Sequence, residues 1–310
     1  MKLPSEFDRI ARYFRPLARP EARNLADDAA VIPPLPGREL VISTDVMNEG
    51  VHFLPGTPAG LLARKLMRVN LSDLAAMGAE PFGYLLTLAV PGPTPDAWFA
   101  GFAQGLAEEQ ARFGLRLLGG DSTSTSQDIS LGLTVLGTTP ICGAIGRDGA
   151  RPGDGLWVSG TLGDAALGLA AKRGRLPDPD GVLVARYDLP TPRLGLADGL
   201  ASAAIDISDG ILADLAHICR ASNVGARVDR GLLPLSAPGR AAGPAWRDLA
   251  LTGGDDYELL MAVPAPAEAA LRDRAKVLNV TVTRIGEIIA GTPEIYEGTA
   301  VLEPLGFSHF

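Results

Sequence analysis

Aspartates recur in six short patches along the chain, and most of these patches also contain Gly, Ser or Thr and follow an apolar, strand-like run. The patches are Asp27-Asp28, Ser43-Thr44-Asp45, Asn70–Asp73, Gly119–Ser122, Asp206–Gly210 and Gly253–Asp256. Mg²⁺ usually binds through carboxylates together with substrate phosphates. Two carboxylates about 4 Å apart repel by about 4 kcal/mol at an effective dielectric constant of about 20. If these patches meet in space, the site has to include divalent metal.

The argument rests on the joint pattern of the patches, and two of them are more informative than the others. Asp73 has apolar Val69 and Met77 four residues to either side, so in a helix it shares their face and is expected to be buried, and buried carboxylates are paired or metal-bound. The alternative for Asp73 is a partly exposed edge position. Ser43 and Thr44, with Asp45, are expected at the C-terminal end of a strand, where hydroxyls and a carboxylate can share a cation.

The remaining patches have simpler alternatives. Asp121 follows two glycines that would let phosphates approach the backbone, but it could also lie in a hairpin turn. Asp209 could be the N-cap of the helix that follows it, although capping does not explain Asp206. Asp27-Asp28 could be a charged turn before a strand, and Asp255-Asp256 again follows two glycines.

Phosphate contacts are also suggested outside these patches. His52 lies in a loop just beyond the Ser-Thr-Asp patch and could contact a substrate phosphate or lie on the surface. Arg147 and Arg151 lie in a turn-rich loop and could neutralise phosphate oxygens or be solvated. Gly160–Gly163 precedes a helix whose N-terminus could bind phosphate, although a tight turn is the simpler interpretation.

Several familiar catalytic motifs are missing. The sequence contains no P-loop and neither the His-Arg-Asp nor the Asp-Phe-Gly motif of protein kinases. No convincing general base accompanies the aspartates, which fits an acceptor that is already anionic, such as a phosphate monoester. The pattern favours a nucleotide held through several Mg²⁺ ions that bridge phosphate oxygens during an in-line transfer.

Composition narrows the class of protein. The 310 residues carry a formal net charge of −8, which argues against nucleic acid as the main partner because backbone binding needs clustered Lys and Arg. No apolar stretch reaches the 18 or so residues of a membrane span, and the N-terminus has no secretory apolar region. Cys142 and Cys219 have no paired spacing, so a disulfide scaffold or zinc site is not expected and a reducing cytoplasm fits.

The pattern of elements predicts an α+β protein of two domains. Strands are expected over 39–43, 84–90, 115–118, 129–137, 156–159, 204–207, 257–263 and 280–289. Helices are expected around Phe7–Phe14, from Pro58 to about Met77, over 95–113, 192–203 and 210–221, after Gly163, and between the last two strands. Residues 140–154 are dense in turn formers and charge, which places a boundary between domains 1–140 and 141–310. Strands and helices mix without a regular βαβ rhythm, so α+β is favoured over a doubly wound sheet.

The sequence resembles the thiamine-monophosphate kinase family over essentially its whole length. The matching segments are Asp27–Ala30, Ser43–Phe53, Val69–Ala79, Gly119–Thr123, Asp206–Gly210, Gly253–Leu259 and the terminal Gly306–Phe310. The His-Phe pair after Ser-Thr-Asp and the terminal Phe-x-His-Phe are the more specific parts. The other patches are shared with a wider superfamily that includes aminoimidazole ribonucleotide synthetase, selenophosphate synthetase and a hydrogenase maturation protein.

This resemblance implies a function and a set of site residues. It implies ATP-dependent phosphorylation of thiamine monophosphate to thiamine diphosphate with several Mg²⁺ ions. Direct in-line transfer without a catalytic side chain is expected, because the sequence offers no convincing nucleophile. The resemblance also implies the aminoimidazole ribonucleotide synthetase-like fold and a cytoplasmic homodimer formed by the sheets of the N-terminal, ATP- and Mg²⁺-binding domains. The implied Mg²⁺ ligands are Asp28, Ser43, Thr44, Asp45, Asp73, Asp121, Asp206 and Asp209. The implied ATP contacts are Gly120, Asp121, Arg147 and Ser208, and the implied substrate contacts are His52, Asp255 and Phe307, whose ring could stack on a heteroaromatic ring.

The chain departs from the family pattern at three positions. Asp255 stands where the family commonly has Glu, Ala26 stands where a Gly usually precedes the Asp pair, and Ala103 stands where some relatives carry a nucleotide-contacting Tyr. These departures affect individual contacts more than the reaction.

Other functions remain as alternatives. The first is an aminoimidazole ribonucleotide synthetase, which would cyclise a formylglycinamidine substrate through phosphoryl activation, and the second is a non-catalytic protein that binds a nucleotide or thiamine diphosphate. A selenophosphate synthetase would need a reactive Cys or selenocysteine near the N-terminus, but the first cysteine is Cys142. The hydrogenase maturation protein would need a C-terminal cysteine, and this chain ends in Phe310.

Overall fold

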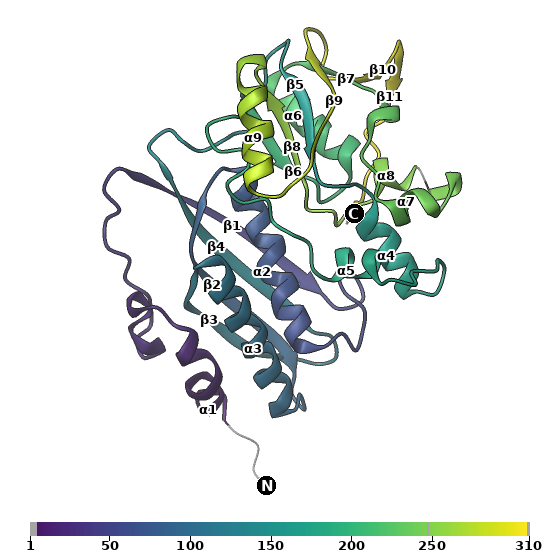
Figure 1. Cartoon of the computed structure of the whole chain (residues 1–310). Helices are drawn as coiled ribbons and strands as arrows, with labels where there is room; N and C mark the ends of the chain where they lie inside the picture. Colours follow the sequence, from purple (N-terminus) through teal and green to yellow (C-terminus); the bar gives the residue numbers. More distant parts are fainter. Residues whose placement is uncertain (1–4, 247, 309–310) are drawn as a thin grey trace. The chain divides into compact units, whose positions relative to one another are not determined.

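The computed structural model describes residues 5–246 and 248–308, which form two compact units. The first unit comprises the chain up to Leu74 together with Glu80–Cys142. The second comprises Ala75–Ala79 and the chain from Gly143 onward. Each unit has its own sheet, with helices packed against it, so the α+β prediction is confirmed (Figure 1).

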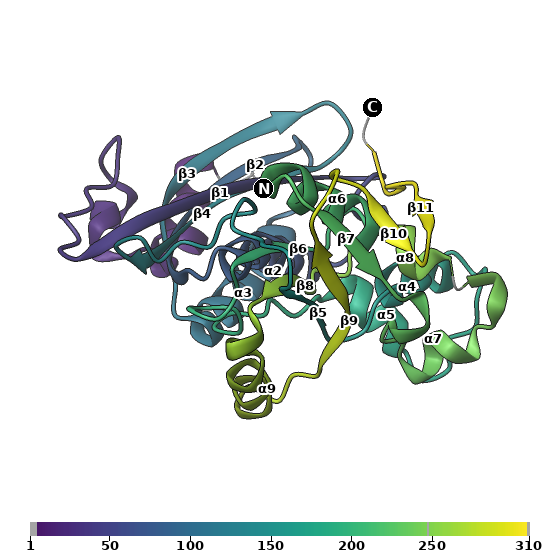
Figure 2. The same ribbon diagram turned by 90° about the horizontal axis from the view of Figure 1, so that it is seen from above.

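The first unit is a four-stranded sheet with the order β1-β4-β2-β3. Its strands are β1 (Arg38–Asn48), β2 (Glu80–Pro91), β3 (Arg116–Thr125) and β4 (Ser130–Pro140). Strand β4 pairs antiparallel with both β1 and β2, while β2 and β3 are parallel and are connected through a helix. Helices α2 (Ala59–Ala76) and α3 (Asp96–Phe113) lie on one side of this sheet (Figure 2).

The alternation of side chains along β2 explains this arrangement. Tyr84, Leu86 and Leu88 are buried on the helix side, whereas Leu85 on the other side is 41% exposed. An antiparallel sheet with one packed and one open face has this period of two. Helix α2 buries Leu66 and nearly all of its neighbours against the packed face.

The N-terminal segment runs along the edge strand β3. It contains α1 (Glu6–Arg9), a π-helical turn (Ile10–Phe14) and two 3₁₀ turns (Arg15–Leu17 and Pro20–Leu25). The N–H group of Arg19 donates to the carbonyl oxygen of Leu117 at 2.9 Å, which uses part of the free edge of the sheet. Within the segment expected to be helical, Phe14 is buried, whereas Phe7 is 78% exposed.

The second unit is a seven-stranded sheet with the order β11-β10-β7-β9-β5-β8-β6. Its strands are β5 (Gly155–Ser159), β6 (Ala203–Asp206), β7 (Gly225–Val228), β8 (Leu259–Val263), β9 (Val282–Ile289), β10 (Ile295–Glu297) and β11 (Ala300–Leu302). Its helices are α4 (Asp164–Lys172), α5 (Val182–Asp188), α6 (Ile211–Ser222), α7 (Ala237–Ala241), α8 (Leu249–Thr252) and α9 (Glu268–Val277).

Both faces of this second sheet are covered. Along β8, Leu260 and Ala262 pack in one core with α6, whereas Leu259 and Met261 pack in another core with α9. Strand β8 is therefore apolar at every position, because neither of its faces meets water.

Three sequence-based expectations about elements are wrong. The segment 192–203 is irregular rather than helical, and Gly195 and Gly199 within it adopt positive φ angles of 77° and 66°. Strand β1 continues through Asp45 to Asn48, so Ser43-Thr44-Asp45 lies inside the strand and not at its end. Strand β3 likewise continues through Asp121 to Thr125, which excludes a hairpin turn at that position.

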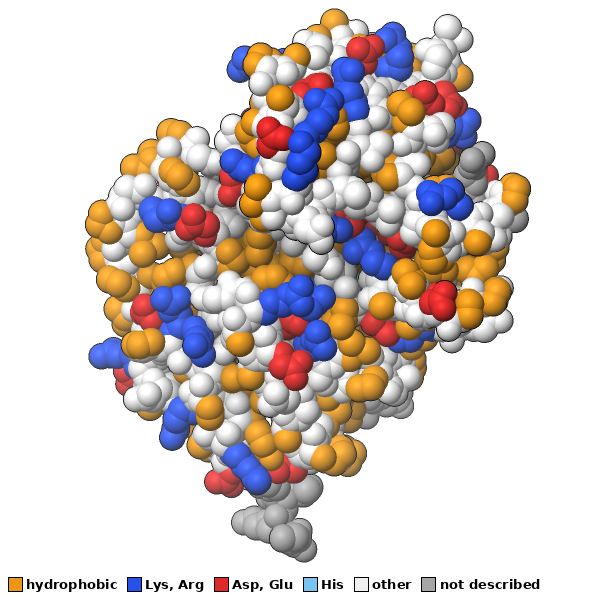
Figure 3. Space-filling view, in the orientation of Figure 1, with side chains coloured by type: hydrophobic (Ala, Val, Ile, Leu, Met, Phe, Trp, Pro, Cys, Tyr) orange, Lys and Arg blue, Asp and Glu red, His pale blue; other side chains and the backbone are white. Residues whose placement is uncertain are grey.

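Surface charge is mixed on the face drawn in Figure 3, where basic and acidic side chains lie side by side. Ion pairs such as Arg64–Glu108 at 3.7 Å and Arg272–Glu268 at 3.4 Å belong to this pattern. Within the described part of the chain, no helix is both long enough and apolar enough to cross a membrane.

Candidate active site

A pair of carboxylates lies between β1 and α2 in the first unit. The Ser43 hydroxyl donates to Oδ2 of Asp73 at 2.6 Å, and the N–H group of Asp45 donates to Oδ1 of Asn70 at 3.0 Å. Burial, followed by repulsion from the nearby Asp73 carboxylate, raises the pKa of Asp45 to about 6. The Ser43 contact places Asp73 on the side of α2 that meets β1, but the side chain is half-buried and not fully buried as expected. The carboxylates of Asp45 and Asp73 repel each other here, so a cation bound between them would be stabilised.

Thr44 is separated from that pair by the geometry of the strand. Successive side chains of a strand point to opposite faces of the sheet, and the Thr44 hydroxyl donates to the carbonyl oxygen of Leu133 at 3.2 Å and accepts from Thr134 at 3.1 Å. The expectation that the Ser43 and Thr44 hydroxyls share one cation with Asp45 is therefore wrong. Only the backbone of Thr44 can reach the side on which Ser43 and Asp45 lie.

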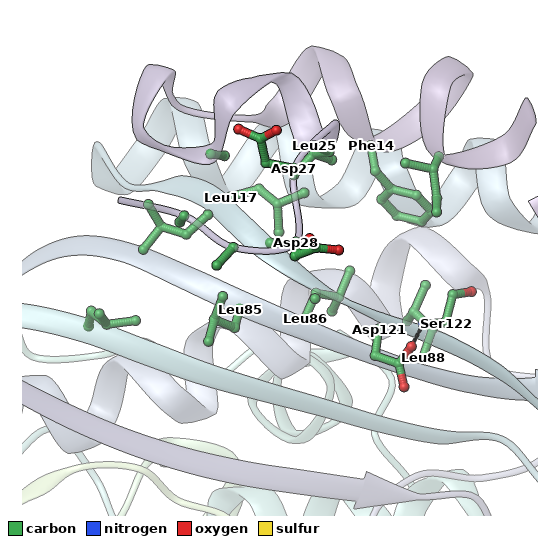
Figure 4. Close-up of a pocket in the computed structure, with 18 of the residues that line it drawn as sticks. Phe14, Leu25, Asp27, Asp28, Leu85, Leu86, Leu88, Leu117, Asp121 and Ser122 are labelled. Atoms are coloured by element: carbon green, nitrogen blue, oxygen red, sulfur yellow. Dashed lines mark hydrogen bonds between the residues drawn. The ribbon is translucent and has the colours of Figure 1, made fainter. Parts of the chain in front are cut away.

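A cavity of about 470 Å³ lies between β2, β3 and the N-terminal segment (Figure 4). Leu85, Leu86, Leu117 and other apolar side chains line most of it. Asp28 from the N-terminal segment and Asp121 from β3 also line it, as Figure 4 shows. Asp27 lies beside them, and its carboxylate pairs with Arg23 at 2.9 Å. An apolar cavity with carboxylates among its lining residues can hold a planar ring and place a metal–phosphate group next to it.

Gly120 is required in the wall of this cavity. A Cβ atom built at Gly120 would lie 1.9 Å from the carbonyl oxygen of Leu86 in the neighbouring strand. Any other residue would push β3 away from β2. The glycine therefore keeps the strands paired at the point where Asp121 joins the cavity lining.

The His52 loop is held by its backbone and by a lysine of α2. The Nδ1 atom of His52 accepts from the N–H group of Asn48 at 3.0 Å. The ammonium group of Lys65 donates to the carbonyl oxygen of His52 at 3.3 Å, and Lys65 is only 3% exposed. The sequence analysis missed Lys65. The signal was available, because Lys65, Val69 and Asp73 are spaced four apart and follow one row of the helix.

Two of the acidic patches lie side by side in the second unit. The N–H group of Ile207 donates to the carbonyl oxygen of Glu258, and the N–H group of Tyr257 donates back to Ile207, both at 2.8 Å. The N–H group of Asp255 donates to the carbonyl oxygen of Ser208 at 2.9 Å. These bonds continue the β6–β8 pairing beyond the strands and bring the Asp206–Gly210 turn against the loop that carries Asp255.

Asp209 does not cap the helix that follows it. The N-cap residue of α6 is Gly210, and no side chain caps that helix. Asp214 in the first turn of α6 accepts instead from the N–H groups of Asp209 at 3.2 Å and Gly210 at 3.1 Å. Burial, followed by repulsion from Asp209, raises the pKa of Asp214 to about 7. The Asp209 side chain is thus available for another role, while Asp206, 5% exposed, ends β6 beside it.

The N-terminus of α4 is occupied by the protein itself. Asp256 accepts from the N–H groups of Gly163 at 2.6 Å and Ala165 at 3.2 Å. The idea that Gly160–Gly163 presents a free helix N-terminus to phosphate is therefore wrong, and the tight-turn interpretation holds. Burial raises the pKa of Asp256 to about 8 in spite of these two hydrogen bonds.

A second buried carboxylate was not anticipated as part of the site. Glu258 is fully buried and accepts from Arg186 and Arg193 at 2.5 Å each, and from the Ser159 hydroxyl at 2.5 Å. The two arginines hold the segment after α4 against the Asp255 loop. Sequence reasoning did not find them, because α5, which carries Arg186, was not predicted, and Arg193 lies in the segment 192–203, which was wrongly expected to be helical.

The remaining predicted residues lie in the second unit near the same turn. Arg147 is exposed, and its charge lowers the raised pKa of Asp214. Phe307 is 51% exposed, and its N–H group donates to the carbonyl oxygen of Asp209 at 2.9 Å. His309 and Phe310, the end of the Phe-x-His-Phe motif, lie outside the described residues. Within residues 5–246 and 248–308, no group of three or more His, Cys, Asp or Glu side chains converges in a way that could hold a metal ion.

Comparison with known proteins agrees with this geometry. Residues 26–139 match the family described as AIR synthase related protein, N-terminal domain, and residues 151–297 match its C-terminal domain. The thiamine-monophosphate kinase of Caulobacter vibrioides is 46% identical to this chain, over 99% of this chain and 91% of the relative. The chain belongs to the thiamine-monophosphate kinase family.

Solved structures of the thiamine-monophosphate kinase family have the same fold. The enzyme from Stenotrophomonas maltophilia K279a superposes with a TM-score of 0.83 at 39% identity, and covers 90% of this chain and 91% of its own. A ThiL protein complexed with AMPPCP and TMP superposes with a TM-score of 0.79 at 29% identity, over 100% of this chain and 99% of its own. The resemblance inferred from the aspartate patches is therefore confirmed, and the chain is a phosphotransferase by its family.

Proposed function

We propose that this protein transfers the γ-phosphoryl group of ATP to thiamine monophosphate and releases thiamine diphosphate and ADP. The observation that carries the proposal is the match to a thiamine-monophosphate kinase at 46% identity over 99% of the chain. The related ThiL protein that was solved with AMPPCP and TMP supports the choice of both substrates. In this reaction a phosphate oxygen of thiamine monophosphate attacks the γ-phosphorus, and the bond from that phosphorus to the β-phosphate oxygen breaks.

The nucleotide is proposed to bind at the cavity of the first unit. Its apolar lining suits the adenine ring, and Gly120 and Asp121 are proposed to contact the nucleotide where β3 meets the cavity. Ser208 and Arg147 of the second unit are proposed to contact the phosphates. The guanidinium group of Arg147 is exposed and is suited to phosphate oxygens.

Divalent metal fits the donor set, and Mg²⁺ is the proposed ion. The raised pKa of Asp45 beside Asp73 supports this, because a cation between the two carboxylates would remove the repulsion. Mg²⁺ is usually bound by one or two carboxylates together with substrate phosphates, so the proposed carboxylates would share the ions with the phosphates of the substrates. When bound, the ions would neutralise charge that develops on the phosphates. The proposed ligands are Asp28, Ser43, Asp45, Asp73, Asp121, Asp206 and Asp209, with Thr44 through its backbone only.

Thiamine monophosphate is proposed to meet His52, Asp255 and Phe307. Asp255 stands where the family commonly has Glu, and its loop is fixed by backbone bonds to Ser208 and Ile207. The transfer is proposed to be direct, because a phosphate oxygen of thiamine monophosphate is already anionic and can attack the γ-phosphorus without a phosphoenzyme. A protein that becomes phosphorylated by ATP alone would contradict direct transfer.

The assembly is proposed to be a cytoplasmic homodimer. The open face of the first sheet carries apolar side chains on β1 and β2, with Leu40 43%, Ile42 58%, Val46 52% and Leu85 41% exposed. Isolated exposed apolar residues are ordinary, but a row of them on one sheet face is typical of an interface.

The experiment that tests the function follows thiamine diphosphate by chromatography after the purified protein is mixed with ATP, Mg²⁺ and thiamine monophosphate. We expect product that disappears when a chelator is added. If folded protein binds ATP and gives no product, the proposal is overturned, and a formylglycinamidine substrate then tests the purine-synthetase alternative.

A further inference from the structure

The segment that follows β11 returns to the turn in front of α6. The N–H group of Phe307 donates to the carbonyl oxygen of Asp209 at 2.9 Å, although the two residues are far apart in the sequence. The same turn also accepts a hydrogen bond at the carbonyl oxygen of Ser208 from the N–H group of Asp255. One turn therefore holds two segments, and each segment carries a residue proposed to bind thiamine monophosphate.

Gly306 is what allows this close approach. A Cβ atom at Gly306 would lie 2.5 Å from the Cβ atom of Ala213 and 2.8 Å from the carbonyl oxygen of Asp209. Both distances are below the 3.0 Å that real Cβ atoms keep from their neighbours. Neither atom can easily move, because Ala213 is in the first turn of α6 and Asp214 fixes the Asp209 turn through two N–H groups.

We propose that Gly306 is a positioning residue for substrate binding: its missing side chain lets residues 303–308 seat on the Asp209 turn, and this seat holds Phe307 in place for thiamine monophosphate. The proposal rests on the proposed function. Phe307 is 51% exposed, so its ring is not held by burial. A ring that is ordered before the substrate arrives spares the substrate the entropy cost of ordering it, which strengthens binding without changing the transfer step.

The variant Gly306→Ala tests the seat. The added methyl group has to push the segment off the turn, so we expect the KM for thiamine monophosphate to rise about tenfold, as overpacking of a tight contact does. We expect kcat at saturating substrate to stay within about twofold, because the Asp209 turn keeps its own hydrogen bonds to Asp214. The KM for ATP should not change.

A matched control and a rescue separate positioning from a general loss of structure. Gly92→Ala is the control, since a Cβ atom at Gly92 would meet nothing within 4 Å. Ala213→Gly combined with Gly306→Ala is the rescue, because it removes the nearest clashing atom while the Asp209 carbonyl oxygen remains. We expect the control to behave like the wild type and the double variant to recover part of the KM.

Hydrogen exchange measured by mass spectrometry gives a readout that does not depend on activity. A peptide that includes Phe307 should exchange faster in Gly306→Ala than in the wild type, because the amide loses its bond to Asp209. Wild-type KM together with wild-type exchange in Gly306→Ala would overturn the inference. If neither the wild type nor Gly92→Ala forms thiamine diphosphate, the proposed function is overturned instead, and the exchange comparison alone decides whether Gly306 holds the segment.

Discussion

At the scale of single residues, the first site depends on which side of one strand each side chain points to. Ser43 and Asp45 face α2, and Ser43 donates to Asp73 at 2.6 Å. Thr44, between them, faces the other way and bonds to Leu133. The sequence predicted the residue types and the inward position of Asp73. It could not predict the separation of Thr44, because the strand was expected to end at this patch, where alternation would no longer apply.

The first prediction uses this difference. Asp73→Asn should lower kcat about a hundredfold or more, which is the usual cost of removing an electrostatic partner of the transition state. The protein should remain folded, because the change also removes the repulsion between Asp45 and Asp73. Thr44→Val is the control and should keep most of the activity, since its side chain lies on the opposite face. Steady-state kinetics at saturating Mg²⁺ and circular dichroism measure the two properties.

Two outcomes would contradict this assignment. Near-normal turnover by Asp73→Asn would remove Asp73 from the metal site. A large loss in Thr44→Val would mean that the Thr44 hydroxyl takes part in the site despite its bond to the Leu133 carbonyl oxygen.

At the scale of elements, helices with a long apolar stripe were predictable and short ones were not. Helices α2 and α3 each run for 18 residues, so their apolar spacing repeats several times. Each helix also begins directly after a proline, α2 after Pro58 and α3 after Pro95. Helix α5 has only 7 residues and α7 only 5, so their apolar patterns do not repeat, and the local signals of α7 are limited to the Ser236 N-cap and the Pro238 that follows it. Strand β1 extends through polar residues because every one of them pairs with β4, and that partner is about 90 residues away in the chain.

The N-terminus of α4 provides a prediction about stability and pH. Burial raises the pKa of Asp256 from 3.8 to about 8 in the folded protein. At a pH between these two pKa values, the Asp256 carboxyl group is ionised in the unfolded chain but keeps its proton in the folded protein. The free energy of unfolding therefore falls as pH rises, by up to about 1.4 kcal/mol per pH unit for one group. The stabilising contribution is complete below the unfolded pKa and is lost as pH rises through the folded pKa.

Urea unfolding in metal-free buffer, followed by circular dichroism across this pH window, measures the effect. Asp214 and Asp45 also have raised pKa values and act in the same direction. Asp256→Asn should therefore flatten the decline without abolishing it, and the exposed Asp273→Asn should not change it. Equal slopes in Asp256→Asn and the wild type would mean that Asp256 is already ionised in the folded protein.

At the scale of the whole molecule, the resemblance implies a dimer formed by the N-terminal sheets, and the open face of the first sheet bears on that expectation. This face is apolar along one side of β1, where Leu40, Ile42 and Val46 alternate with buried or polar positions. Such a row is costly in a monomer, since burying each large aliphatic side chain is worth about 1.5–3 kcal/mol. A second copy of the same sheet can cover it, because a twofold axis brings the same patch to both sides of one interface.

The last prediction follows from this argument. Val46→Glu, which places a charge in the middle of the row, should convert a dimer to a monomer at micromolar concentration. Val301→Glu is the matched control, because Val301 is similarly exposed at 55% but lies on β11 in the second unit. Light scattering coupled to size-exclusion chromatography gives the mass of each variant against the 32.3 kDa of one chain. A wild type that elutes as a monomer would exclude the dimer. A Val46→Glu variant that remains dimeric would place the interface on another face, because a dimer formed through this face would have to bury the unpaired carboxylate introduced at position 46.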